Sequence, residues 1–447
     1  MKYWSDTFIF LKISIRKRIF RQAEYELIGN FASTNNESYY MKYFSVLFPA
    51  FFFGLFARAQ EVVRLTVSSD VSQQQAPVTL NVRTHKNIRS ATVRVNGRDV
   101  ACQLDDLDRD GQYDELSFLT DIKESEVQHV VVNLSDEEWT TAYPARTYAE
   151  MMLRNPKVKE KNKHDIYLTA ITLDASTKDP FTVLHHHGVA FENDLVAMRI
   201  YMDARQTIDL YGKFHQGLEL YDTQFYTSPA QKAQGYGDDV LWVGQTFGLG
   251  TLRGWDGNAP QMLTDVEHRT LKLVARGPLR TIVEVIDDGW KAPCPTTKER
   301  ISMNTRYTLY AGKRDCEVSI SFNKPVPSHN FSTGIINVKN SVEHSNGKGL
   351  RGCWGTDWPV SEKDSAGHKR ETVGLGIYIP QKNVVKELTA NKDNYPFVVG
   401  NINRQFTYHI TFCSDNETWG FHSAKEWFAY LDGWKKELES PVTVSIK

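Results

Sequence analysis

Apolar and polar side chains alternate with a period of two along much of this chain, and this pattern restricts it to a fold rich in β-strands. Two such segments, 302–310 and 316–322, flank Ala311-Gly312-Lys313 and predict a hairpin. Other segments with strand character are 271–275, 279–286, 333–338, 373–379 and 406–412. Strands in such succession predict an all-β protein built around a large antiparallel β-sandwich.

One stretch near the C-terminus departs from this pattern and has helical spacing. Ser423 and Glu426 form a capping-box pattern. The apolar residues that follow are spaced to share one helical face: Trp427, Leu431, Trp434 and Leu438. We therefore expect one C-terminal helix that ends before Pro441, and a short closing strand at 442–446.

Residues 60–145 are expected to form a separate small β-sandwich domain ahead of the large domain, which spans residues 150–447. Short alternating segments lie at 61–68, 77–83 and 91–95. Asn96-Gly97, between two valine-containing segments, is a strong signal for a two-residue hairpin turn.

The first residues of the chain have a different character. Residues 41–59 combine a lysine, an apolar run and Ala57-Arg58-Ala59, which is typical of a secretory signal peptide with its cleavage site. The run is too short to span a membrane. We expect translation to begin at Met41, residues 1–40 to be a start-site artefact, and the mature protein to be periplasmic or secreted.

Charge and cysteine content exclude several classes of protein. The formal net charge is −1, so the composition favours neither nucleic acid nor a membrane surface as a partner. The five cysteines are scattered and form neither a disulfide framework nor a metal-ligand spacing. If the chain is exported, two of them can form one disulfide bridge.

Residues 195–213 predict a hairpin with two chemically different faces. Parity places Met198 and Ile200 on an apolar face, and the reverse turn falls at residues 203–205. The other face collects polar groups: Arg199, Tyr201, Asp209, Tyr211 and Lys213. This face is interpreted either as a half-exposed sheet with paired charges or as a binding face for an anionic, hydroxyl-rich ligand.

Three adjacent histidines, His185, His186 and His187, precede this hairpin. Neighbouring strand residues point to opposite faces, so the three do not readily bind one metal ion. A single histidine acting as a general acid or base is the stronger hypothesis, and His187 is the candidate. The alternative is that the histidines are structural.

The run from 235 to 256 interleaves glycines with aromatic and charged residues. It lacks the strand and helix context of a nucleotide-binding fingerprint, so no nucleotide cofactor is expected. Aromatic faces pack on sugar rings, and charged groups bind sugar hydroxyls. The candidate sugar-binding residues are Tyr236, Asp238, Arg253, Trp255 and Asp256, with His186 and Tyr201 from the preceding segment. Trp242 and Phe247 are expected in the core.

Alternating aspartates in 106–115 predict a structural calcium site. Asp106, Asp108 and Asp110 precede Gly111, and Asp114 follows. This spacing matches the first half of a calcium loop, but Ser117 stands where an EF-hand has its bidentate glutamate. A charged turn that binds no ion is the alternative.

Segments 185–213 and 235–257 together resemble a family of exported Bacteroidota proteins known as a domain of unknown function, whose genes typically lie beside those of polysaccharide-degrading enzymes. That family is similar to sugar-active supersandwich proteins, which include galactose mutarotases and polysaccharide lyases. The resemblance implies a supersandwich-like large domain and a carbohydrate ligand.

Two functions remain from the sequence. The first is an enzyme that abstracts a proton from an acidic oligosaccharide: a lyase, dehydratase or epimerase. Its candidate catalytic residues are His187, Arg199, Tyr211 and Lys213. The second is a non-catalytic carbohydrate-binding protein of a polysaccharide-degradation system. A glycosidase is less favoured, because no carboxylate spacing indicates a flanking pair.

Overall fold

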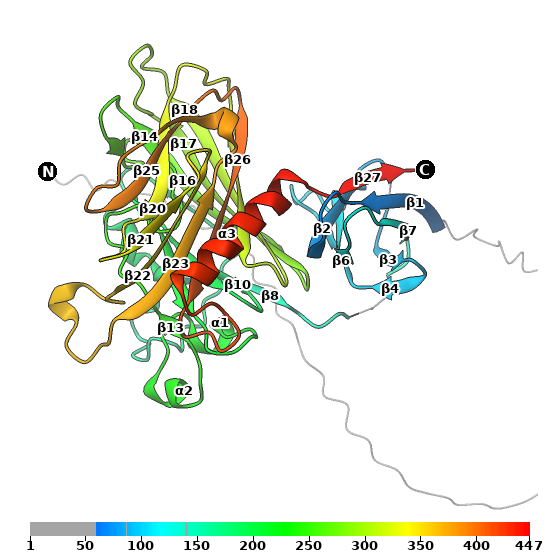
Figure 1. Cartoon of the computed structure of the whole chain (residues 1–447), viewed down its shortest axis with the longest axis horizontal. Helices are drawn as coiled ribbons and strands as arrows, with labels where there is room; N and C mark the ends of the chain where they lie inside the picture. Colours follow the sequence, from blue (N-terminus) through cyan, green and yellow to red (C-terminus); the bar gives the residue numbers. More distant parts are fainter. Residues whose placement is uncertain (1–59, 86, 139–141) are drawn as a thin grey trace, which may run out of the picture. The chain divides into compact units, whose positions relative to one another are not determined.

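The computed structural model describes residues 60–85, 87–138 and 142–447 (Figure 1). The expected signal peptide and start-site segment lie outside the described residues. Among the described residues, no helix has both the length and the apolar composition needed to cross a membrane. The named strands pair antiparallel throughout, which confirms the expected all-β architecture.

A small β-sandwich contains the first strands and the last strand of the chain. Its five-stranded sheet has the order β27 (Thr443–Ile446), β1 (Gln60–Ser68), β7 (Val127–Ser135), β3 (Ser90–Val95), β4 (Arg98–Val100). Its three-stranded sheet has the order β2 (Gln73–Asn81), β6 (Glu115–Ile122), β5 (Cys102–Asp105). Asn96 and Gly97 both have positive φ, as the turn between β3 and β4 requires. Strand β27, assigned to the large domain from the sequence, pairs with β1 instead.

The large sandwich is organised around one nine-stranded sheet. Its strands, in spatial order, are β21 (Val342–Ser345), β22 (Leu350–Asp357), β23 (Glu371–Tyr378), β26 (Gln405–Ser414), β19 (Asp315–Phe322), β18 (Ile301–Tyr310), β17 (Arg280–Trp290), β16 (His268–Arg276) and β9 (Ala170–Asp174). The hairpin expected around Gly312 is confirmed as β18 and β19. Alternate residues of β18 and β19 are buried, so one face of this hairpin is core and the other is polar.

Two five-stranded sheets pack against the apolar face of this sheet. One has the order β13 (Asp238–Asp239), β12 (Ile208–Gly212), β11 (Ala197–Tyr201), β10 (Leu184–Asn193), β8 (Thr147–Leu153). The other has the order β15 (Pro260–Gln261), β14 (Arg253–Trp255), β20 (Phe331–Ile336), β25 (Asn394–Val399), β24 (Val384–Glu387). Ring pairs such as Phe191–Tyr307 and Phe322–Phe331 join the layers into one core.

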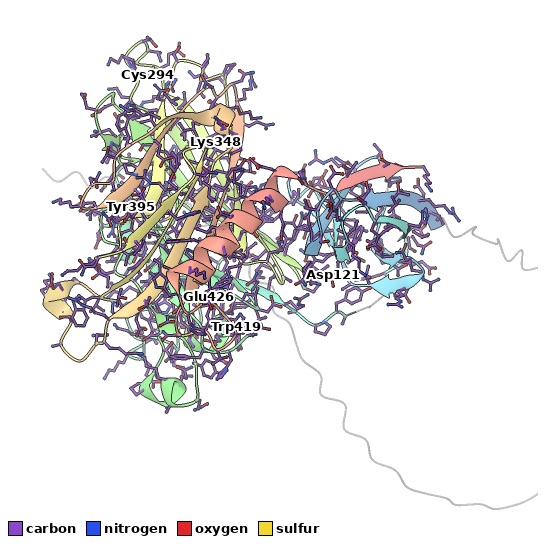
Figure 2. All side chains as sticks on the ribbon, in the orientation of Figure 1. Asp121, Cys294, Lys348, Tyr395, Trp419 and Glu426 are labelled. Atoms are coloured by element: carbon purple, nitrogen blue, oxygen red, sulfur yellow. The ribbon has the colours of Figure 1, made fainter. Side chains whose placement is uncertain are left out.

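The expected C-terminal helix is confirmed as α3 (Ala424–Glu439), which lies across β22 and β23 (Figure 1). Ser423 accepts from the Glu426 backbone N–H at its first turn, and Glu426 is labelled there in Figure 2. The helix lies close because glycines face it: a Cβ on Gly352 would lie 2.3 Å from Leu431. The other helices are short: α1 (Leu220–Thr223), α2 (Pro229–Ala233), and the 3₁₀ turns η1 (Pro180–Thr182), η2 (Glu362–Asp364) and η3 (Gln381–Asn383).

Candidate functional site

The predicted hairpin forms as β11 and β12, and both of its faces are buried. Met198 and Leu210 pack in the main core, as parity predicts. The expected half-exposed polar face is instead covered, because the segment after β12 folds back over it and packs Leu220 and Phe225 against Tyr211. The polar side chains of this face are therefore enclosed within the protein, where pairing decides what each can do.

Arg199 is held rigidly inside this enclosed layer. Its Nε and Nη2 donate to Asp209 at 2.9 and 2.6 Å, and Nη2 also donates to Asp239 at 3.0 Å. Tyr201 donates to the same Asp209 carboxylate at 2.7 Å, and the guanidinium lies 4.2 Å from the Phe225 ring centre. Arg199 Nη1 is buried and has no hydrogen-bond partner within the described chain. One donor of a fixed cation is therefore free.

The polar atoms of Lys213 and Tyr211 are engaged in hydrogen bonds within the protein. The Lys213 ammonium donates to Glu192 at 2.6 Å and to the carbonyls of Asn193 and Gly217 at 2.7 and 2.5 Å, which accounts for all three of its protons. Tyr211 is fully buried, and its hydroxyl contacts Glu219 at 2.9 Å. These contacts give the two predicted catalytic residues structural roles.

The three histidines lie on an irregular part of β10. The register shifts between Leu184 and Val189, and His186 and His187 have φ of 42° and 71°. Non-glycine residues adopt this left-handed region at a cost, and such strain is concentrated at functional sites. Gly188 follows because a Cβ there would lie 1.7 Å from the Ile200 carbonyl oxygen.

The histidine rings point to three different partners. His185 stacks on His164 at 3.9 Å, His186 Nε2 lies 3.4 Å from Glu150, and His187 stacks on Phe181 at 3.7 Å. The expectation that one metal ion does not bind all three agrees with this divergence.

Burial keeps these histidines neutral at neutral pH. It is the largest cause lowering the pKa of His185 to about 2, of His186 to about 3 and of His187 to about 4. Burial also raises the pKa of Glu150 to about 8, so the Glu150–His186 contact joins two neutral groups. Within the part of the chain that the structure describes, His185 Nε2 and both ring nitrogens of His186 are buried and have no hydrogen-bond partner.

His187 has one nitrogen in position to accept a proton. Its Nδ1 lies 2.9 Å from the Phe181 carbonyl oxygen, which can only accept, so Nδ1 carries the hydrogen. The lone pair is therefore on Nε2, and the side chain is partly exposed. The Tyr201 ring centre lies 6.2 Å from the His187 ring and 5.3 Å from the Arg199 guanidinium.

Tyr226 is a site residue that sequence reasoning missed. It is partly exposed, and its ring centre lies 5.0 Å from Lys161 Nζ, 5.8 Å from the Arg199 guanidinium and 5.4 Å from the His185 ring. Asp239, whose side chain is 26% exposed, belongs to the same cluster because its carboxylate pairs with Arg199. Asp239 lies in the run 235–256 and Tyr226 lies outside it, and no parity or spacing linked either residue to Arg199.

Apart from Asp239, the predicted site residues of the glycine-rich run do not join this cluster. Arg253 is buried and donates to the carbonyls of Gln245 and Thr246. Asp256 accepts from two backbone N–H groups of its own turn, beside Trp255 in a separate sheet. The remaining candidates also pair locally, Tyr236 with Asp222 and Asp238 with Lys232. Phe247 is in the core as expected, whereas Trp242 is 51% exposed and the core prediction for it is wrong.

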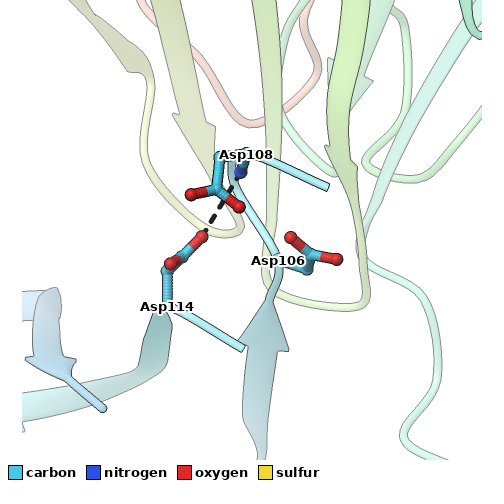
Figure 3. A group of neighbouring side chains, drawn as sticks. All are labelled: Asp106, Asp108 and Asp114. Carbon is cyan, nitrogen blue, oxygen red and sulfur yellow. Dashed lines mark hydrogen bonds between the residues drawn. The ribbon is translucent and has the colours of Figure 1, made fainter. Parts of the chain in front are cut away.

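The aspartate loop brings three of its four predicted ligands together. Carboxylate oxygens of Asp106, Asp108 and Asp114 all lie within 4.8 Å of one another (Figure 3). The fourth residue, Asp110, is outside this group and accepts from Gln112 N at 2.8 Å. Arg83 already pairs with Asp114 and, at 2.8 Å, with Asp108. The carboxylates thus suit a hard cation, but an arginine now balances part of their charge.

The fold is all-β, and beside an irregular strand it buries a cluster of titratable side chains, some of whose atoms have no hydrogen-bond partner among the described residues. The chain belongs to the family described as domain of unknown function (DUF4861), whose model matches residues 58–444. This confirms the resemblance to a family of unknown function. No curated protein matches the chain in sequence.

Two solved structures to which the chain shows similarity come from Enterococcus faecalis. An alpha-mannosidase from strain V583 is 10% identical with a TM-score of 0.42, over 86% of this chain and 46% of that one. A protein in the glycosyl hydrolase family 38 is 11% identical with a TM-score of 0.42, over 86% and 47%. This chain spans less than half the length of either protein, and likeness at this level does not identify a function.

Proposed function

We propose that this chain is an exported protein that abstracts a proton from an acidic oligosaccharide, as a lyase, dehydratase or epimerase. The observation that carries the proposal is the fixed Arg199 guanidinium with its unused Nη1, set among neutral histidines. A cation held in place before reaction stabilises negative charge that develops on a sugar carboxylate. Neutral histidines in the same cluster can accept the proton.

The chemistry assigns one task to each group. His187 Nε2 takes the proton from the carbon next to the sugar carboxylate, and the electron pair of that C–H bond moves into the carboxylate system, opposite Arg199. In an elimination, the pair then forms a carbon–carbon double bond, and the neighbouring C–O bond breaks. Tyr226 is the proposed acid that protonates the departing oxygen. In an epimerisation, the carbon regains a proton on its other face.

The test is turnover of acidic oligosaccharides by the purified protein, followed by mass and by ultraviolet absorbance of the new double bond. The expected result is product formation that His187→Ala and Tyr226→Phe each reduce at least tenfold. His422→Ala is the matched control. His422 is an exposed histidine that pairs with Asp415, and it lies far from His187 in the sequence. Parent-rate turnover by both cluster variants, with normal folding, would move the site elsewhere.

Sugar binding without chemistry is the second candidate. It is favoured by the number of polar groups in this layer that are already paired internally, with Tyr211 and Lys213 as examples. Binding of acidic oligosaccharides without any change in their mass or absorbance would support it.

Calcium in the aspartate loop and export to the periplasm or medium complete the proposal. Three converging carboxylates are the donor set that calcium prefers. A bound ion there would displace Arg83 from Asp108 and stabilise the loop. Export is supported by the apolar run and Ala57-Arg58-Ala59, and N-terminal sequencing of the protein from its native host is expected to begin at Gln60.

A further inference from the structure

The polar face of the nine-stranded sheet carries a groove remote in sequence from the histidine cluster. Its volume is about 990 Å³, and it crosses strands β17, β18, β19 and β26. This size is at the upper end for small-molecule sites. Register places Asn304 opposite Ser321, Arg306 opposite Ser319, and Ser319 opposite Thr407, so these side chains form a regular polar grid.

The charges in this grid largely cancel. Arg306 Nη2 and Nε lie 2.8 and 2.9 Å from the same oxygen of Glu284, which leaves no isolated cation at the centre. The other central groups are the neutral side chains of Asn304, Ser319 and Thr407, together with Glu317, whose carboxylate accepts from the Ser319 hydroxyl. They offer both donors and acceptors, and the matching ligand is one whose groups also donate and accept without charge.

Asn304 has a hydrogen-bonding atom that the protein does not use. Its Nδ2 donates to Glu284 at 3.0 Å, and because a carboxylate can only accept, this fixes which end of the amide is nitrogen. Its Oδ1 is buried and has no partner within the described residues. Buried acceptors are normally satisfied, so a ligand donor is expected at this position.

We infer that this groove binds an uncharged segment of an oligosaccharide. Sugar hydroxyls donate and accept in the way the grid requires, and the core-facing residues of the same strands leave no large apolar surface in the groove to favour a lipid or an apolar peptide. From Asn304 to Tyr310 the groove follows six residue steps, roughly 20 Å of strand, which suits a chain of sugars better than a single ring.

The experiment is calorimetric titration of the purified chain with neutral hexasaccharides of gluco, xylo, manno and galacto configuration. At least one is expected to bind. Ser319→Phe, which fills the groove, is expected to weaken that binding at least tenfold, and Gln405→Phe at the exposed rim serves as a second blocking variant. Thr356→Phe is the matched control: Thr356 and Thr372 form a hydroxyl pair at 2.8 Å on the same sheet, like Ser319 and Thr407 at 3.0 Å, but lie outside the groove.

Two outcomes overturn the inference: no binding of any of the four hexasaccharides at millimolar concentration, or unchanged binding by both blocking variants. The groove is tested by calorimetric binding of neutral sugars, whereas the proposed proton-abstraction site is tested by turnover of acidic ones. Failure of the groove and failure of the proposed proton-abstraction site are therefore seen in different measurements.

Discussion

The aspartate loop and the histidine cluster both gather several ionisable groups in a short stretch of sequence, yet the fold treats them in opposite ways. In the loop, carboxylates near the surface are paired with Arg83 and with backbone N–H groups such as those of Arg109 and Gly111. In the cluster, His185 and Arg199 are buried and keep atoms that have no hydrogen-bond partner among the residues that the structure describes. Density of charge in a sequence therefore does not identify reactive groups; burial and unfilled hydrogen-bonding capacity do.

The energetic consequences differ in the same direction. Exposed ion pairs contribute about 0–1 kcal/mol, because water screens them. A buried polar atom without a partner costs on the order of 1–3 kcal/mol. Several such atoms lie together in this cluster, next to left-handed backbone at His186 and His187. Both features lower the stability of the folded protein, and a bound substrate can offset that loss.

The largest expected effect separates a buried from an exposed lysine–carboxylate pair. Lys213→Met leaves Glu192 buried without its cation and is expected to lower the free energy of unfolding by about 3–5 kcal/mol. Lys232→Met breaks the partly exposed pair with Asp238 and is expected to cost less than about 1 kcal/mol. Urea unfolding at neutral pH measures both, and equal values would remove the contrast between the two environments.

The next effect concerns the fixed cation. Arg199→Lys keeps the positive charge but loses the planar guanidinium that pairs with Asp209 and Asp239. Turnover of an acidic oligosaccharide is therefore expected to fall by about 10²–10³. Because Arg199 is buried, a loss of stability accompanies the change. Rates are therefore compared well below the melting temperature; an unchanged rate there would exclude Arg199 from catalysis.

A smaller effect tests the loop. Free calcium at about one hundred times its dissociation constant is expected to stabilise the protein by about 2.7 kcal/mol. Chelator lowers the melting temperature in that case, and Asp108→Ala abolishes the response. Arg83→Ala removes the competing cation and is expected to tighten calcium binding. Identical melting curves with and without chelator would leave the loop as an ordinary charged turn.

The smallest expected change is in the pH dependence of kcat/KM, which is expected to stay flat as the pH falls through 6.5. Burial lowers the pKa of His187 to about 4, so its neutral, proton-accepting form persists as the pH falls through 6.5. The acid limb of kcat/KM is therefore expected near pH 4. Stability behaves differently: between about pH 6.5 and 4 the unfolded chain binds a proton that the folded chain does not, so stability falls as the pH falls. An acid limb of kcat/KM near 6.5 would show that His187 is solvated.

Local pattern was sufficient for the elements of this protein. Alternation predicted β18 and β19, Asn96-Gly97 predicted a hairpin turn, and spacing predicted α3, because each depends on residues close together in the chain. Parity also separated Arg199, which lies outside the main hydrophobic core, from Met198 and Ile200, which lie in it.

Only the tertiary structure decided which polar groups remained available. The sequence placed Arg199, Tyr211 and Lys213 on one face, but whether each is free depends on segments that pack from elsewhere: Glu192 and Gly217 use Lys213, and Glu219 uses Tyr211. The pairing of β27 with β1 likewise joins the two ends of the described chain. Such contacts depend on distance in space rather than along the chain, and no local periodicity encodes them.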